Sequence, residues 1–160
     1  MAVRKMVGPA LAAVLVVAAT TYVFTAPYTR IAGVRIGGRM TPPPADFTAA
    51  FQRNVGLIKT GGFPPFVVHV LLVPFKGGFV TATRPDGGYW SKRASAAPDG
   101  YVRTGDTTLA MRATEILGED RLPYLREWGG PDLDRRLSGG VIVGVSEPLR
   151  DFQVFLWTPR

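Results

Sequence analysis

The start of the chain is dominated by one apolar run. Residues 6–26 contain no charge, and their number matches the roughly 20 residues that an α-helix needs to cross a bilayer. Pro9 falls in the first turn, where its missing N–H costs little, and Arg4 and Lys5 precede the run. We therefore expect residues 1–27 to form a single N-terminal transmembrane helix. Residues 17–19 would also suit signal cleavage, but the apolar run continues beyond them, which favours an uncleaved signal anchor.

The flanking charges leave the orientation of this predicted anchor open. Arg4, Lys5 and the N-terminal amine stand before the apolar run, and Arg30, Arg35 and Arg39 follow it. The excess of positive charge on cytoplasmic flanks therefore favours neither direction. The sequence predicts a single-pass membrane protein whose remaining domain faces either side.

Behind the anchor, the pattern predicts a linker and then a folded domain. Residues 28–45 are rich in Gly and Pro, as linkers are, and residues 46–160 form the predicted domain. Asp46 is a suitable N-cap for a short helix that runs to about Asn54. A second helix is predicted after residues 118–120, because Leu122, Leu125 and Trp128 recur at a spacing of three before a Gly-Gly-Pro stop.

The rest of the domain has the composition of β-strands separated by tight turns. β-Branched and aromatic residues are concentrated in short stretches bounded by Gly, Pro or Asp. Glycine-containing turns are predicted at residues 76–78, 85–88 and 104–106. The predicted strands are residues 55–59, 66–75, 79–83, 101–104, 107–117, 141–145 and 152–157. These features predict a mainly β (α+β) domain: a small antiparallel β-barrel with one or two short helices.

Composition removes several kinds of chemistry. The chain has no cysteine and one histidine, His69, inside a predicted strand, so thiolate and histidine-rich metal sites lack their residues and we expect no metal. A serine triad would have to use His69, but the sequence has no G-x-S-x-G nucleophile elbow. Lys and Arg number 19 against 12 Asp and Glu, which gives a net charge of +7. These charges are scattered and form no basic stripe interleaved with aromatics, which argues against nucleic acid and favours a basic surface beside an anionic membrane.

A set of short motifs in the second half of the chain resembles a known family. Trp90 leads a short stretch that closes in Ala97-Pro98, and two predicted strands around Gly105 follow. The chain then carries Met-Arg-Ala at 111–113, Gly-Glu-Asp-Arg at 118–121, and Thr-Pro after the last predicted strand. Over residues 54–160 this order is similar to that of the deazaflavin-dependent nitroreductases and quinone reductases, which are split β-barrels related to the flavin reductases and the pyridoxamine-phosphate-oxidase-like barrels.

The resemblance implies a cofactor, a substrate class and a site. The cofactor would be a deazaflavin coenzyme (8-hydroxy-5-deazaflavin) or FMN, the acceptor a quinone-like or nitro compound, and the assembly a homodimer. The cofactor phosphates would meet Lys59, Thr60, Gly61 and Gly62. A second basic contact would come from Lys92 and Arg93, and Tyr89 and Trp90 would line the ring pocket. No catalytic residue is identified.

The sequence departs from the family at the phosphate turn. The family carries Gly-Arg-x-Ser-Gly between its first two barrel strands, whereas residues 59–65 read Lys-Thr-Gly-Gly-Phe-Pro-Pro, with one cation. Ala97 stands where the family has asparagine. Two functions therefore stay open: a membrane-anchored reductase, or a non-enzymatic membrane-anchored β-domain that binds a lipid or a protein partner.

Overall fold

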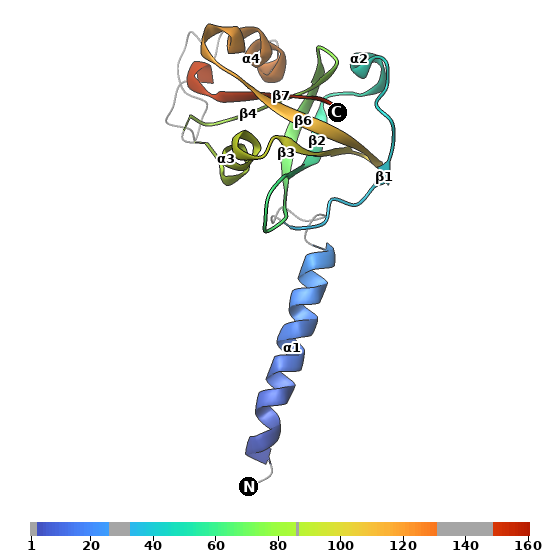
Figure 1. The fold of residues 1–160 in the computed structure, drawn as a ribbon, viewed down its shortest axis with the longest axis vertical. Coiled ribbons are helices and arrows are strands. Elements are labelled where there is room, and N and C mark those ends of the chain that lie inside the picture. The colour runs from blue at the N-terminus through green and yellow to red at the C-terminus, as the bar shows by residue number, and fades with distance from the viewer. Residues whose placement is uncertain (1–2, 26–32, 86, 131–148) are drawn as a thin grey trace.

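The computed structural model describes residues 3–25, 33–85, 87–130 and 149–160 (Figure 1). The N-terminal helix α1, Val3–Thr25, carries apolar side chains on every side over residues 8–21. Val14, Leu15, Val16 and Val17 are each 60–65% exposed, and four consecutive residues of an α-helix point in all directions around its axis. Among the residues that the structure describes, no helix is both long enough and apolar enough to cross a membrane. The predicted anchor extends beyond the side chains that are described, which within α1 are those of residues 8–21.

Six strands form a closed antiparallel barrel, as the sequence predicted. Each strand is antiparallel to both of its neighbours, and the pairing of β6 with β7 closes the ring. In order around the barrel the strands are β2 (Asn54–Thr60), β3 (Phe66–Phe75), β4 (Gly78–Thr83), β7 (Gln153–Pro159), β6 (Thr107–Ile116) and β5 (Asp99–Thr104). The strand predicted at residues 141–145 lies outside the described residues.

Alternating side chains fill the barrel. Ile58, Phe79, Val102 and Leu109 have no exposed surface and belong to one core cluster. Along their strands the side chains that face the interior are mostly apolar, and those that face outwards are both apolar and polar. Trp157 is the largest fully buried side chain, and its indole N–H donates to the Thr81 hydroxyl at 3.0 Å. The one polar group of this large side chain is thus satisfied inside the core.

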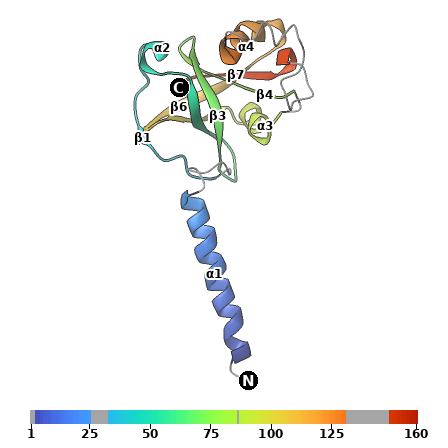
Figure 2. The ribbon, with the colours of Figure 1, turned by 180° about the vertical axis from the view of Figure 1, so that it is seen from behind.

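Three short α-helices cover the barrel in the described chain, one more than the upper limit that was predicted. They are α2 (Phe47–Ala50), α3 (Tyr89–Ala96) and α4 (Arg121–Gly129), and Figure 2 shows α2 and α4 near one end and α3 nearer the other. The prediction that the first of them runs to Asn54 was wrong. Phe51 is already extended, and Asn54 is the first residue of β2. The pattern misled because Phe47 and Phe51 both reach the core, one from the helix and one from the connection after it, and their rings contact at 5.7 Å.

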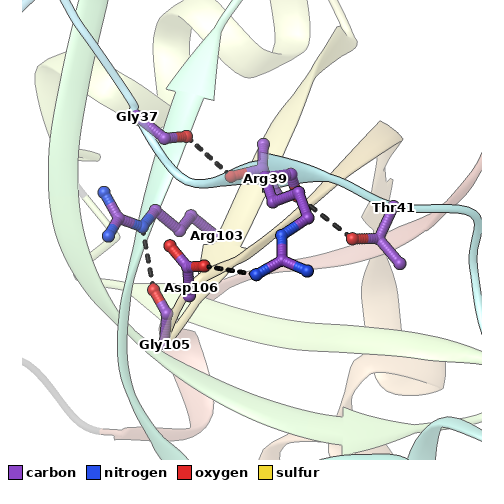
Figure 3. Close-up of polar contacts among 7 residues, drawn as sticks. Gly37, Arg39, Thr41, Arg103, Gly105 and Asp106 are labelled. Carbon is purple, nitrogen blue, oxygen red and sulfur yellow. Dashed lines mark hydrogen bonds and ion pairs between the residues drawn. The ribbon is translucent and has the colours of Figure 1, made fainter.

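The described part of the predicted linker is hydrogen-bonded along the outside of the barrel. Gly33 exchanges two backbone hydrogen bonds with Val67, at 2.9 and 2.7 Å. Further along, β1 (Arg39–Met40) pairs parallel to β6, and the Thr108 hydroxyl donates to the Gly37 carbonyl at 2.8 Å. Figure 3 shows how this segment is tied to the turn between β5 and β6. These hydrogen bonds hold residues 33–41 against the barrel wall, and we call this segment the strap.

Candidate functional site

The structure brings five of the eight residues predicted for the cofactor site into one cluster. These are Thr60, Gly61 and Gly62, from the end of β2 and the loop after it, and Tyr89 and Arg93 from α3. Arg93 is the centre of the cluster, because its guanidinium bonds to Thr60, Gly61 and Tyr89 and lies beside Gly62. The β2–β3 loop and α3 therefore meet at Arg93.

The Arg93 guanidinium is engaged by the protein itself. Its Nε donates to the Thr60 hydroxyl at 3.1 Å, and one terminal nitrogen donates to the Tyr89 hydroxyl at 3.1 Å. The other terminal nitrogen donates to two carbonyl oxygens, those of Gly61 at 2.8 Å and Pro64 at 2.7 Å. Four of the five N–H groups of an arginine are thereby used. We call this arrangement the Arg93 clamp.

Aromatic rings hold the clamp in place. The guanidinium carbon lies 5.4 Å from the centre of the Tyr89 ring and 6.0 Å from that of Phe66. The two rings contact each other edge to face, with centroids 4.8 Å apart. A guanidinium that is stacked and hydrogen-bonded in this way is fixed in both position and orientation.

The glycines of the loop are required by close packing. A side chain on Gly61 would meet the Asp99 carbonyl oxygen at 2.8 Å and the Ala97 side chain at 3.0 Å, so the end of α3 lies directly against the loop. Gly62 has φ +83°, a conformation that other residues rarely adopt. Two glycines in succession thus let the loop turn its carbonyl groups towards Arg93.

This geometry does not fit a phosphate. A phosphate-binding turn presents backbone N–H groups and free cations to the anion, whereas here the loop presents carbonyl oxygens and Arg93 is bound to them. As arranged, the residues of the clamp therefore do not fit the phosphates of a deazaflavin or FMN. In the described part of the chain, no group of three His, Asp or Glu residues is placed to hold a metal ion either.

Trp90, Lys92 and Lys59 lie outside the clamp. Trp90 is 8% exposed and packs on Phe155 with ring centroids 5.3 Å apart, so its indole belongs to the barrel core. Lys92 is exposed on α3. Lys59 lies on the outer face of β2, where its ammonium is 6.0 Å from the centre of the Tyr101 ring.

Lys59 contributes to a separate cleft of about 310 Å³ between the strap and the barrel wall. The Tyr101 ring lies near a second cation, because the guanidinium carbon of Arg160 is 5.2 Å from its centre. The residues that line the cleft are Ile36, Gly37, Gly38, Met40, Lys59, Tyr101 and Thr108. The cleft is mostly apolar, with one primary ammonium group.

Sequence reasoning missed Tyr101 and Phe63 as surface features. Phe63 is 92% exposed at the tip of the β2–β3 loop, and Tyr101 sits opposite Lys59 across the β2–β5 pair. The available signal for Phe63 was its place in the turn Gly-Gly-Phe-Pro-Pro. The glycines and prolines keep this aromatic residue out of a strand. Nothing in the sequence pairs Tyr101 with Lys59, because they are far apart along the chain.

The chain matches no model of a known protein family and no curated protein.

Proposed function

We propose that this protein is a membrane-anchored β-barrel domain that acts by binding, and that its ligand is an acidic lipid held in the cleft beside Lys59. The observation that carries this proposal is the separation of the two basic groups. Arg93 is used to hold the β2–β3 loop, while Lys59 lines an apolar cleft elsewhere. A cation on an apolar wall suits a ligand with an anionic head and a hydrocarbon part.

The cleft has the parts that such a ligand requires. Ile36 and Met40 offer apolar contact, and Met40 is largely exposed. In the described chain, Lys59 makes no salt bridge, and its interaction with the Tyr101 ring leaves all three ammonium hydrogens available to an anion. The Thr108 hydroxyl is already donated to Gly37, so it fixes the strap and does not bind the ligand.

The proposed anchor is supported by the character of α1. A helix that is apolar on all sides must bury that surface in an apolar medium, either lipid or protein. The described side chains of α1 are exposed throughout residues 8–21, and the barrel does not cover them. Insertion into the bilayer would satisfy this surface and would also place the cleft close to its lipid ligands.

Lipid titration of the full chain tests the proposal. The protein, held in a neutral detergent, is titrated by calorimetry with dodecyl phosphate and, separately, with dodecanol. We expect saturable binding of the phosphate amphiphile only, and a loss of at least tenfold in affinity for Lys59→Gln. Lys92→Gln is the matched control, because it removes an exposed lysine outside the cleft. Equal affinities of the two variants would refute the site.

A second candidate function is the reductase implied by the motif resemblance. The observation in its favour is that α3 and the β5–β6 hairpin lie at the expected points of the sequence, with Tyr89 56% exposed and able to meet a ring. This function requires Arg93 to leave the loop carbonyls, and it requires a cytosolic domain and a homodimer with the cofactor at its seam. Saturable binding of a deazaflavin or FMN to the purified protein would favour it over lipid binding. A reporter fused after Arg160 that lies outside the cell would exclude it.

A further inference from the structure

The β2–β3 loop presents an aromatic side chain to solvent at one end of the barrel. We call residues 61–65 the tip loop. Phe63 is 92% exposed, more than any other large apolar side chain that the structure describes, and its neighbours Gly62 and Pro64 are exposed as well. Single exposed apolar residues are common on protein surfaces, so exposure alone does not indicate a function.

The way the tip loop is held makes this exposure informative. The Arg93 clamp binds the carbonyl groups of Gly61 and Pro64, which flank the segment that carries Phe63. Gly61 also packs against Ala97 and the Asp99 carbonyl at the end of α3. The loop is therefore built around an arginine that fixes both of its limbs, and Phe63 is presented by a preorganised support. A residue that enters a binding partner from such a support loses little conformational entropy when it binds.

The tip loop lies at the end of the barrel where the chain arrives from α1. Gly33 pairs with Val67, two residues after the loop, and only residues 26–32 separate Gly33 from the end of α1. Seven residues span at most about 25 Å. Figure 1 shows the lower end of β3 on the same side of the barrel as α1. The opposite end of the barrel carries the β3–β4 and β5–β6 turns.

We propose that the tip loop is a membrane contact that inserts Phe63 into the boundary between headgroups and acyl chains of the bilayer that holds α1. This inference rests on the proposed membrane anchor. Aromatic side chains are enriched at that boundary. Tyr89, 56% exposed beside Phe66 on the same side of the clamp, supplies a second aromatic ring with a polar tip. The net charge of +7 favours approach to an anionic surface. The contact would fix how the barrel, and with it the Lys59 cleft, faces the lipid.

The absence of cysteine from the chain makes a direct test simple. Phe63→Cys is labelled with an NBD fluorophore in the full-length protein, which is reconstituted into vesicles of phosphatidylcholine and phosphatidylglycerol. Asp106→Cys, an exposed position in the turn at the opposite end of the barrel, is the matched control. We expect a blue-shifted emission at position 63 and at least threefold stronger quenching by shallow spin-labelled lipids than at position 106.

The outcomes separate this inference from the anchor on which it rests. If both labelled proteins float with the vesicles but position 63 resembles position 106, the tip-loop contact is refuted and the anchor stands. If neither protein floats, both proposals fail. Replacement of Phe63 by the photoreactive aromatic benzoylphenylalanine gives a second measurement that keeps an aromatic ring in place. Lipid adducts at position 63 and none at position 106 are then expected, and adducts at neither position would refute the contact.

Discussion

At the scale of single residues, the most informative side chain is Arg93. Sequence reasoning predicted it as a basic contact to a cofactor phosphate, and the structure places it at the predicted loop but bound to protein oxygen atoms. The difference could not be read from the sequence. It depends on the carbonyl groups of Gly61 and Pro64 turning inwards, which glycine permits but does not dictate.

Removing the clamp tests its structural role. Arg93→Ala should lower the free energy of unfolding by about 2 kcal/mol, because hydrogen bonds from a charged donor are lost and two carbonyl groups lose their partner. Arg93→Lys should recover only a small part, since an ammonium cannot reproduce the planar set of contacts. Urea unfolding in neutral detergent measures the change, and hydrogen exchange of residues 61–65 localises it. Unchanged exchange in Arg93→Ala, with exposed Lys92→Ala as the control, would contradict this role.

Asp46 gives a prediction for pH. The pKa of its carboxyl group is lowered from 3.8 by the Thr48 hydroxyl first, and then by the Ala49 and Thr48 backbone N–H groups. A lowered folded-state pKa stabilises the fold above pH 3.8, and this contribution is lost as the pH falls through the folded-state pKa. Asp46→Asn keeps a capping oxygen but removes the charge. Its melting temperature should lie below that of the parent protein at pH 7, and the gap should narrow towards pH 3. A constant gap would contradict the assignment.

At the scale of elements, the described strands and the helix α4 (Arg121–Gly129) were predicted well, whereas the end of the first helix was not. The strand predicted over residues 66–75 is β3 with the same bounds, because an apolar run rich in β-branched and aromatic residues, bounded by Pro and Gly, defines a strand locally. The helix from Asp46 was predicted too long, because Phe51 fits a helical spacing yet contacts Phe79 from extended backbone. The strap was predicted as a linker, since pairing with β6 depends on residues about 70 positions away.

The β3–β4 turn allows a clean test of backbone conformation. Lys76 and Gly77 both have positive φ, 48° and 74°, as the two central residues of a type I′ hairpin turn require. A side chain on Gly77 would meet no atom within 4 Å, so Gly77→Ala isolates the backbone cost. We expect a loss of about 1 kcal/mol in the free energy of unfolding. Lys76→Asn should be close to neutral, because asparagine suits this conformation but the contact of Lys76 with the Tyr124 ring is lost. A neutral Gly77→Ala would refute the assignment of the turn.

At the scale of the whole molecule, one continuous path joins the proposed anchor, the tip loop and the cleft. The chain leaves α1, pairs beside the tip loop at Gly33, forms one wall of the Lys59 cleft at Ile36 to Met40, and then enters the barrel through α2. The strap therefore has a structural role and also connects the end of the barrel that we propose faces the membrane to the candidate ligand site. The resemblance to the split-barrel reductases does not predict this connection, because its motifs begin only after residue 54.

Two truncations separate the strap from the anchor. Removal of residues 1–32 should leave the unfolding midpoint of the barrel nearly unchanged, because it leaves all of the strap contacts in place. Removal of residues 1–41 eliminates the paired backbone groups of Gly33, Arg39 and Thr41 and uncovers Thr108, which is 1% exposed. We expect a further loss of about 2 kcal/mol or more. Urea unfolding followed by tryptophan fluorescence, to which the buried Trp157 contributes, measures both proteins. Equal midpoints would show that residues 33–41 are a linker after all. A lower midpoint for the shorter protein, together with loss of dodecyl phosphate binding, would show that the strap both completes the barrel and forms the cleft.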